Sequence, residues 1–471
     1  MYDNRDNIDF GKANIGRLFA SIFFPTLLGM LFNMAFLLTD GIFVGHGIGA
    51  HGLASINLIA PIMMTINGLG MMLGVGASVV AAIHLSKGNN KAARINVTQA
   101  FEAGILISLL MGVFCYLFPS AVLRMLGVEG ALYDSTLEYY LWFLPTCLLL
   151  MIQTLGLFVI RLDGSPRYAM YSNIIPAVVN IVLDYVFIFP CKMGLMGAAL
   201  ATDFGGLVGA LMVAYYMLFR TRSLHLYRIK ASWTSLRLTL RNVGYMVRVG
   251  FPGLVGEIAV AVMMLSGNIA FMHYIGDDGV AAYSIACYLF PLVYMICNAV
   301  AQSAQPIISF NHGAGKQPRV FGTLRFSLLV SVTIGVLVSL VFLFFSPTVV
   351  LCFLTPESPT YALASAGLPY YGSGFLFMAL NICIVGYLQS IEKSGAASLF
   401  TILRGIVFLV AAFAVLPGLL GTAGLWLSMP CAELLTTAAI AVYAIATHRR
   451  RKNSSTEARK PTEVGHNKNK I

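Results

Sequence analysis

Two aspartates stand inside segments that are otherwise apolar enough to enter a lipid bilayer. Asp184 lies in NIIPAVVNIVLDYVFIFP (residues 173–190), and Asp40 ends the segment FNMAFLLTD. A charged side chain at the centre of a membrane helix costs at least about 2.5–3.5 kcal/mol, so such residues mark functional sites by default. We therefore treat Asp40 and Asp184 as candidates for chemistry inside the membrane.

Amide and hydroxyl groups accompany these acids. Asn173, Asn180 and Asp184 stand at i, i+7 and i+11, which is one face of a helix, and Thr202 follows in the next apolar segment. If the first half of the chain forms a bundle, Asp40, Asn180, Asp184 and Thr202 converge. Carboxylate, amide and hydroxyl oxygens suit a small hard cation, and two close carboxylates also suit a shared proton. The residue types alone do not decide between Na⁺ and H⁺.

Other polar residues in apolar segments allow two interpretations. Glu257, in GFPGLVGEIAV, is expected to face a cleft and meet a cationic substrate, or to form a second proton site. Tyr139, Tyr140 and Thr202 would serve equally well as hydrogen-bonding partners of neighbouring helices. Arg404 and Glu433 are expected to pair with each other. We find no spacing typical of a metal-ligand cluster and no HExxH or GxSxG motif, so we expect no enzyme activity and no cofactor.

The composition decides which class of protein positions these residues. The chain has 471 residues, of which 58% are hydrophobic and 10% charged, and its mean hydropathy is +0.81. Soluble proteins carry about 25% charged residues, so the sequence predicts an all-α, polytopic membrane protein. Twelve apolar spans are long enough to cross a bilayer: 15–43, 53–83, 94–118, 134–162, 166–190, 195–220, 242–274, 279–311, 319–346, 361–390, 394–418 and 421–447.

The basic residues predict the orientation of these spans. The net charge is +11, and all Lys and Arg except Arg124 and Lys192 fall on one side of the predicted membrane. The positive-inside rule explains this asymmetry better than nucleic-acid binding does. We expect a multi-pass protein of the cell membrane with both termini in the cytoplasm. The polar N-terminal tail (1–14) lacks a signal-peptide core and is expected to be retained, and the basic tail 448–471 is expected to be disordered.

The chain also repeats itself. Phe24-Pro25 recurs as Phe251-Pro252, 227 residues later, and Gly49, Gly52, Pro190, Gly194 and Gly197 recur at the same offset. Gly88-x-x-Lys91-x-x-Arg94 recurs as Gly313-x-x-Lys316-x-x-Arg319 at an offset of 225. We expect two pseudo-symmetric six-helix bundles around a central cleft: an N-lobe (15–220), a cytoplasmic linker (221–241) and a C-lobe (242–447).

The repeat distinguishes the two halves. Position 40 corresponds to Gly267 and position 184 to Ala411, so the second half lacks both acids. We therefore expect cation coupling in the N-lobe. Pro25 and Pro252 lie inside helices and predict kinks. The kink in the first helix is either fixed or dependent on the protonation of Asp40.

These residues together resemble a known family. The two six-helix halves, the FP opening of each, LLTDGIFVGHGIGAHGLA, and the PxxxGxxGAALAT pattern at 190–202 are similar to the MATE (multidrug and toxic compound extrusion) transporters over about residues 10–447. Asp40, Asn180, Asp184 and Thr202 resemble the N-lobe cation site of the DinF-like branch, and the resemblance places Tyr139 near them. Glu257 resembles an acid of the NorM-like branch, whose second acid, in the tenth helix, is absent here.

The resemblance implies a secondary active antiporter. It would export amphipathic, often cationic compounds in exchange for H⁺ or Na⁺ by alternating access. We expect it to work as a monomer in contact with membrane lipids. We expect its cleft to be lined by Met and Phe, which are abundant (22 and 31) and adapt to varied ligands. The alternative is a flippase of lipid-linked precursors, which needs a cleft rich in Arg and Lys.

Overall fold

The computed structural model describes residues 8–128, 130–230 and 232–457, and this part of the chain is helical without strands. The first half contains α1 (Ile15–Gly47), α2 (Ala50–Ser86), α3 (Asn90–Leu117), α4 (Pro119–Met125), α5 (Tyr133–Leu162), α6 (Pro166–Ile188) and α7 (Gly194–Tyr215). The second half contains α8 (Trp233–Tyr274), α9 (Asp277–Gly313), α10 (Gln317–Phe344), α11 (Ser346–Leu351), α12 (Pro359–Gly372), α13 (Phe375–Ser390), α14 (Ser394–Ile402), α15 (Phe408–Leu420) and α16 (Thr422–Glu457).

Eleven helical spans in the described residues are long and apolar enough to cross a membrane, and a bent pair makes the twelfth. The bent pair is α12 and α13, which meet at an angle of 42° and together fill the predicted span 361–390. The predicted span 394–418 is also irregular, because a π-helical turn (Leu403–Val407) separates α14 from α15. The predicted span 195–220 ends in a second π-helical turn, Tyr216–Arg220. The twelve predicted spans therefore exist, but three of them are not continuous α-helices.

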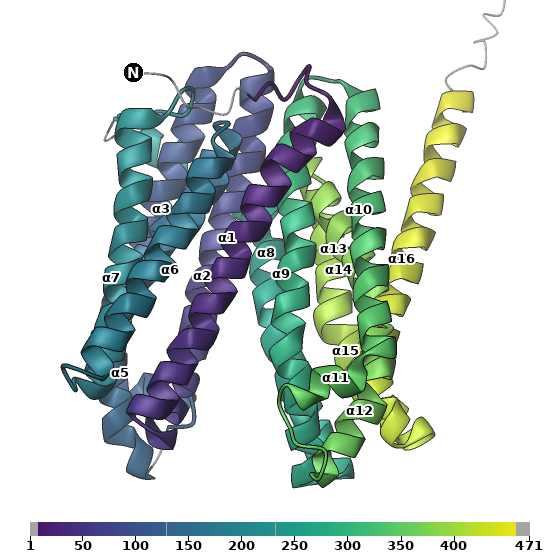
Figure 1. The fold of residues 1–471 in the computed structure, drawn as a ribbon. Coiled ribbons are helices and arrows are strands. Elements are labelled where there is room, and N and C mark those ends of the chain that lie inside the picture. The colour runs from purple at the N-terminus through teal and green to yellow at the C-terminus, as the bar shows by residue number, and fades with distance from the viewer. Residues whose placement is uncertain (1–7, 129, 231, 458–471) are drawn as a thin grey trace, which may run out of the picture.

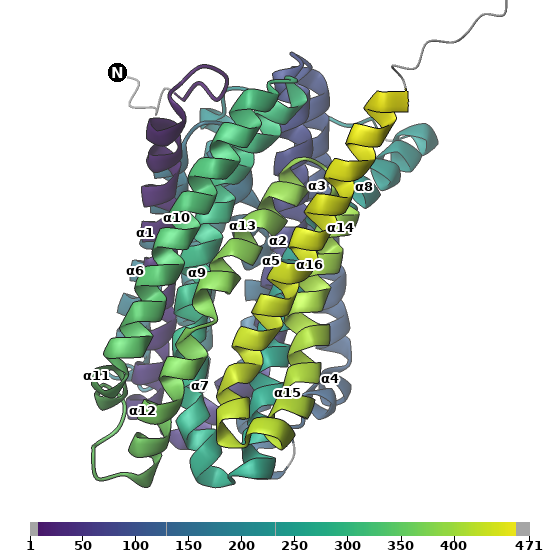
Figure 2. The same cartoon turned by 90° about the vertical axis from the view of Figure 1, so that its right-hand side faces the viewer.

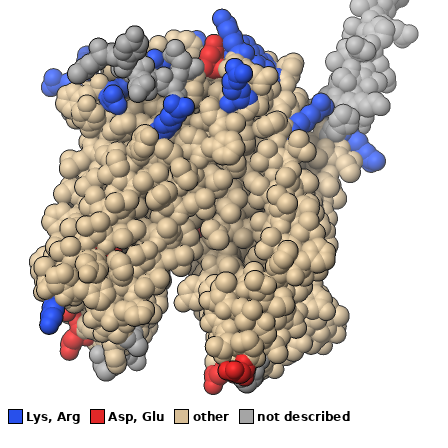
Figure 3. Space-filling model, viewed as in Figure 1, with Lys and Arg blue, Asp and Glu red and all other residues tan. Residues whose placement is uncertain are grey.

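The helices form two bundles, as predicted. Helices α1–α7 make the N-lobe and α8–α16 the C-lobe; the two lie side by side in Figure 1, and in Figure 2 the C-lobe lies in front of the N-lobe. Lys and Arg side chains gather at the end of the molecule where the N-terminus lies, which we call the basic end (Figure 3). At the opposite end the two lobes diverge around an open cleft (Figure 3).

Backbone geometry confirms the internal repeat and corrects one register. Gly49 and Gly276 precede α2 and α9 with φ of +96° and +89°, and Gly194 and Gly421 both have φ of +59°. Positive φ is accessible to glycine at little cost, which explains why glycine marks these turns in both halves. The turn glycine Gly88 (φ +73°) corresponds to Gly315 (φ +71°), at the common offset of 227. The match of Gly88 with Gly313 was therefore wrong, because Gly313 still belongs to α9.

The first helix of each lobe crosses to the other lobe at the basic end. The start of α1 packs on α9 and α10, and its far half packs on α6. The start of α8 packs on α2 and α3. Pro25 and Pro252 lie within these two helices, and Pro252 lies inside the segment of α8 that contacts α2, since Gly250 and Gly253 on either side of it face Met72 and Met71. Figure 1 shows α1 running diagonally from the C-lobe at the basic end to the N-lobe at the cleft end.

The segments around the lobes are more helical than the sequence indicated. Helix α8 begins at Trp233 and so includes the last part of the predicted linker 221–241. Helix α16 continues to Glu457, so the first part of the predicted tail 448–471 is helical rather than disordered. Both helices continue beyond their apolar spans because most polar residues there have adequate helix propensity. Residues 458–471 and 1–7 of the two predicted tails lie outside the described residues.

Candidate functional site

Three contacting helices bring the predicted cation-site residues together in the N-lobe. Helix α6 carries Asn180 and Asp184 and packs between α1 and α7. Close packing depends on glycine at two positions: a Cβ on Gly205 of α7 would lie 3.0 Å from Cβ of Asn180, and one on Gly29 of α1 would lie 3.1 Å from Nδ2 of Asn173. Small residues at such crossings allow the backbones to approach closely. Asn173 therefore faces α1, as its helical face predicted, but toward the basic end.

The polar groups of this site are almost fully buried. The exposed fraction is 0% for Asp184, 2% for Asn180 and 8% for Asp40. The carboxyl groups of Asp40 and Asp184 interact directly with each other. Asn180 Nδ2 donates to Thr202 Oγ1 at 3.4 Å, and Thr202 Oγ1 donates to the carbonyl oxygen of Ala198 at 3.1 Å. Asp40, Asn180, Asp184 and Thr202 thus form one cluster with contributions from α1, α6 and α7.

Four oxygen atoms of this cluster have no hydrogen-bond partner among the described residues. They are Asp40 Oδ1, Asn180 Oδ1 and both Oδ1 and Oδ2 of Asp184. A buried polar atom without a partner costs about 1–3 kcal/mol, and more when it is charged. A cation or a proton at this place satisfies these oxygens. Two carboxylates with an amide and a hydroxyl give the hard oxygen set that Na⁺ uses, and the adjacent carboxyl pair equally suits a shared proton.

Tyr139 on α5 closes one side of the cluster. Its side chain is 4% exposed, contacts Thr202 and lies within electrostatic range of Asp40 and Asp184. Its ring stacks on Phe143 at a centroid distance of 5.7 Å, which fixes its orientation. The structure therefore brings all five predicted residues together, Tyr139 included.

A third acid approaches the cluster from α7. Asp203 Oδ1 accepts a hydrogen bond from Thr146 Oγ1 on α5, and Asp203 lies within electrostatic range of Tyr139. An acid directly after Thr202 in an apolar span is the feature by which the sequence could have indicated Asp203. We assigned no role to this residue from the sequence. Its hydrogen bond to Thr146 distinguishes it from Asp184, whose carboxylate has no such donor.

Glu257 lies apart from this cluster, at the contact between the lobes. It is half-buried on α8, and its carboxylate interacts with the side-chain amide of Asn67 on α2. Thr154 Oγ1 of α5 donates to Asn67 Oδ1 at 3.3 Å. A Cβ on Gly68 would lie 3.3 Å from Cβ of Glu257, so the helices are in close contact here. Glu257 is therefore linked to the N-lobe through Asn67.

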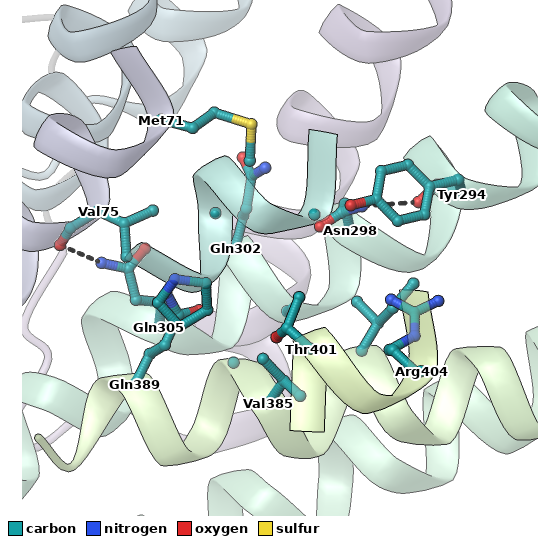
Figure 4. A pocket seen from close by; sticks show the side chains of 16 residues that line it. Met71, Val75, Tyr294, Asn298, Gln302, Gln305, Val385, Gln389, Thr401 and Arg404 are labelled. Atoms are coloured by element: carbon teal, nitrogen blue, oxygen red, sulfur yellow. Dashed lines mark hydrogen bonds between the residues drawn. The ribbon is translucent and has the colours of Figure 1, made fainter. Parts of the chain in front are cut away.

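A polar cavity of about 60 Å³ lies between α2 and the C-lobe (Figure 4). Figure 4 shows amide, hydroxyl and guanidinium groups directed into it from α9, α13 and the α14 region. Its polar lining consists of Tyr294, Asn298, Gln302, Gln305, Gln389, Thr401 and Arg404. Met71 is its single Met, and no Phe lines it. The Met and Phe lining expected for the cleft at the other end of the molecule stays a prediction, because this cavity does not test it.

The predicted pairing of Arg404 with Glu433 is confirmed. Arg404 Nη2 donates to Glu433 Oε1 at 2.6 Å, and both side chains are buried. Asn381 Nδ2 donates to Glu433 Oε2 at 2.7 Å. The carboxylate of Glu433 is therefore fully partnered, in contrast with those of Asp40 and Asp184. Among the described residues, no group of three or more His, Cys, Asp or Glu side chains is arranged to hold a metal ion.

Comparison with known proteins extends these findings. The MatE family model matches residues 25–186 and 252–415, one match in each lobe. A multidrug export protein MepA of Staphylococcus saprophyticus is 23% identical over 427 residues, covering 90% of this chain and 92% of that protein. An FAD transporter of Shewanella oneidensis is 25% identical, covering 67% and 70%.

Solved structures show the same fold. The outward-facing structure of a multidrug resistance MATE family transporter of the MOP superfamily superimposes with a TM-score of 0.84 at 20% identity, covering 94% of this chain and 97% of that one. A MATE structure in complex with MaD3S gives a TM-score of 0.83 at the same identity. Matches to both lobes, over more than half of the chain, show that this protein is a transporter, not an enzyme, and belongs to the MATE family.

Proposed function

We propose that this chain is a secondary active antiporter that exports amphipathic, often cationic compounds in exchange for H⁺ or Na⁺. The observation that carries the proposal is the set of four unpartnered oxygens on Asp40, Asn180 and Asp184. A purely structural cluster would pair these oxygens with donors, as the C-lobe does with Glu433. Drug export is the activity named for the staphylococcal relatives, and here it is part of the proposal.

The two lobes supply the alternating access. With the basic end in the cytoplasm, as the positive-inside rule predicts, the cleft of Figure 3 opens to the outside. The cation enters from this side and occupies Asp40 and Asp184, with Asn180, Thr202 and Tyr139 around it. Neutralising the two carboxylates favours release of the drug and return of the cleft to the cytoplasm. There the cation leaves and a new drug molecule binds.

The surroundings fit a protein that works as a monomer within the cell membrane. Large apolar side chains are exposed on both lobes, including Leu110, Leu211, Leu265 and Leu337. These side chains contact lipid once the twelve spans lie in a bilayer. In this scheme Glu257, at the contact between the lobes, meets a cationic substrate; the second interpretation is a second proton site.

The flippase alternative requires cations that are free to bind a pyrophosphate group. The guanidinium that lines the described cavity belongs to Arg404, and Glu433 neutralises it. The same argument applies to FAD, the substrate named for the Shewanella relative. The described cavity therefore favours neutral or cationic substrates over diphosphates.

The test is transport by the purified protein in vesicles with one gradient imposed at a time. We expect efflux of a fluorescent cationic drug to be driven by a pH gradient or by a Na⁺ gradient, and to disappear when both are collapsed. FAD is the comparison substrate. Transport of the drug without either gradient, or of FAD in preference to the drug, would contradict the proposal.

A further inference from the structure

The segment that precedes α1 lies on the opposite lobe. Residues 8–14 lead into an N-lobe helix, yet Phe10 is buried in a cluster that contains Val300, Ile307 and Val320 of the C-lobe. The rings of Phe10 and Phe310 are 5.9 Å apart. A Cβ on Gly11 would lie 3.2 Å from Nζ of Lys316. The segment is therefore packed tightly against the corner between α9 and α10.

Three side chains of that corner hold the segment by its carbonyl oxygens. Asn311 Nδ2 donates to Phe10 O at 2.9 Å, and Lys316 Nζ donates to Gly11 O at 3.1 Å. Arg319 Nη2 donates to Ala13 O at 2.7 Å and to Phe10 O at 3.2 Å. Arg319 Nε also donates to Asn311 Oδ1 at 3.2 Å, which orients the amide. We call Asn311, Lys316 and Arg319 the clasp.

The chemistry of the clasp is unusual for surface cations. Its two charged groups bind backbone carbonyls, and among the described residues neither group forms an ion pair with a carboxylate. Charge-assisted bonds to carbonyl oxygens are stronger than neutral ones and depend on the path of the backbone. They depend little on the side chains of the held segment. The clasp therefore recognises the shape of residues 10–13 and fixes where α1 begins.

The position of α1 connects the clasp to the cation site. Its start is bound to the C-lobe by the clasp and by packing of Leu18, Phe19 and Ile22 on α9 and α10. Its far end carries Asp40 into contact with Asp184 in the N-lobe. For the cleft to open at the basic end, these contacts of α1 with the C-lobe must part. The contacts are formed in the present structure, in which the cleft is open at the other end (Figure 3).

We propose that Asn311, Lys316 and Arg319 are positioning residues for transport: they fasten the start of α1 to the C-lobe and so hold the basic end closed while the cleft is open at the opposite end. The clasp releases its carbonyls when the lobes exchange access. This inference rests on the proposed transport function only for its second readout, because the first measures access directly.

The first readout is labelling of a cysteine placed in the cavity. Ala301→Cys on α9 lines the cavity and is buried. A membrane-impermeant thiol reagent is applied from the basic end, with the chain lacking Ala301→Cys as the background. The two most exposed native cysteines, Cys191 and Cys352, follow α6 and α11 at the cleft end. We expect Arg319→Gln to raise the labelling rate at least about fivefold, because the population opened at the basic end grows.

The matched control is Arg325→Gln. Arg325 is an exposed residue of the same helix, it loses the same charge on substitution, and its side chain bonds no other described residue. Its labelling rate should equal that of the parent chain. Lys316→Met, which removes one bond, should give a labelling rate between those of the parent chain and Arg319→Gln. Arg319→Lys, which keeps the charge, should raise the labelling rate less than Arg319→Gln does. Lys316→Met also keeps the test decisive if Arg319→Gln does not fold.

The second readout is the concentration dependence of transport on the driving cation. A smaller population open at the cleft end lowers the apparent affinity for a cation that binds from that side, so Arg319→Gln should raise the KM for the cation about threefold or more. Misfolding would lower the maximal rate without changing KM. Unchanged labelling in both Arg319→Gln and Lys316→Met would overturn the clasp. Increased labelling in a chain without cation-driven transport would leave the clasp in place and reject the antiport instead.

Discussion

Arg161 on α5 donates a hydrogen bond of 2.7 Å from Nη1 to Oε1 of Gln302 on α9, and this bond joins the two lobes. The guanidinium is 6% exposed, and its Nε donates to the carbonyl oxygen of Leu157. It also lies over the ring of Phe158, 4.7 Å from the centroid. Within the described residues, its partners are an amide, a carbonyl and a ring, with no carboxylate. The lobe interface therefore holds a buried cation that is hydrogen-bonded but not neutralised.

Supplying the missing charge should slow transport. Gln302→Glu places a carboxylate against Arg161 and replaces a neutral acceptor with a charged one, which strengthens the bond between the lobes. We expect turnover to fall about tenfold, because about 1.4 kcal/mol of added stabilisation of one state changes its equilibrium by that factor. Gln302→Leu, which removes the acceptor, is the comparison and should increase access from the basic end. Equal turnover in the two variants would show that this contact does not govern the exchange of access.

Neutralising Asp40 should abolish coupling without unfolding the protein. Asp40→Asn removes a carboxylate that is buried and incompletely partnered, so the substitution costs little stability or increases it. We expect drug resistance of cells and cation-driven efflux in vesicles to be lost, with an unchanged melting temperature. Glu138→Gln on α5, at an exposed position, is the control for loss of one acid. Normal export by Asp40→Asn would contradict the assignment of the site.

Glu257 should affect the substrate more than the coupling cation. It lies at the lobe contact with Asn67, apart from Asp40 and Asp184, so Glu257→Gln removes a charge between the lobes while keeping an acceptor for the amide. We expect the KM for a dicationic or monocationic drug to rise about tenfold, with little change for a neutral drug. The ratio of cations to drug should stay constant. A changed ratio would instead assign Glu257 to a second proton site.

The pair of Arg404 and Glu433 should matter for stability. Glu433→Gln leaves a buried guanidinium without its counter-charge, which is expected to cost about 3–5 kcal/mol. Replacing both residues, as Arg404→Met with Glu433→Leu, should restore much of the loss, because no charge then remains buried. Thermal unfolding of the purified variants in detergent measures both effects. A double variant as unstable as Glu433→Gln would show that the ion pair contributes more than mutual neutralisation.

Close contact between α2 and α8 should be required to close the basic end. A Cβ on Gly250 would lie close against the backbone carbonyl oxygen of Met72, and one on Gly76 against that of Met246. Gly250→Ala should therefore force the helices apart and reduce transport strongly. Gly244→Ala on the same helix is the control, since its Cβ would meet no atom within 4 Å. Alanine there should leave transport unchanged and favour the helix by up to about 1 kcal/mol. Transport by Gly250→Ala at the parent rate would show that the helices separate at no cost.

Much of the fold could be predicted because its signals are local or periodic. Long apolar spans give the helices, and the turn glycines Gly49 and Gly276 give the repeat through a backbone conformation that favours glycine. The match of Gly88 with Gly313 failed because letters alone do not show which glycine has positive φ. The break between α12 and α13 and the π-helical turn at Arg404 were also missed, since both depend on packing within the C-lobe.

The sequence by itself determined that the chain spans a membrane, that it consists of two related halves, and that the first half alone carries Asp40 and Asp184. These properties follow from composition and from residue types along the chain, and they do not depend on contacts between distant segments. Only the tertiary structure decided that Asp40 and Asp184 meet, that Glu257 contacts Asn67, that the cavity is lined by amides, and that Arg319 holds the start of α1. Each of these contacts depends on which faces of distant helices touch. In a membrane, helices pack closely where small residues allow it, and the sequence pattern does not show which two helices meet at such residues.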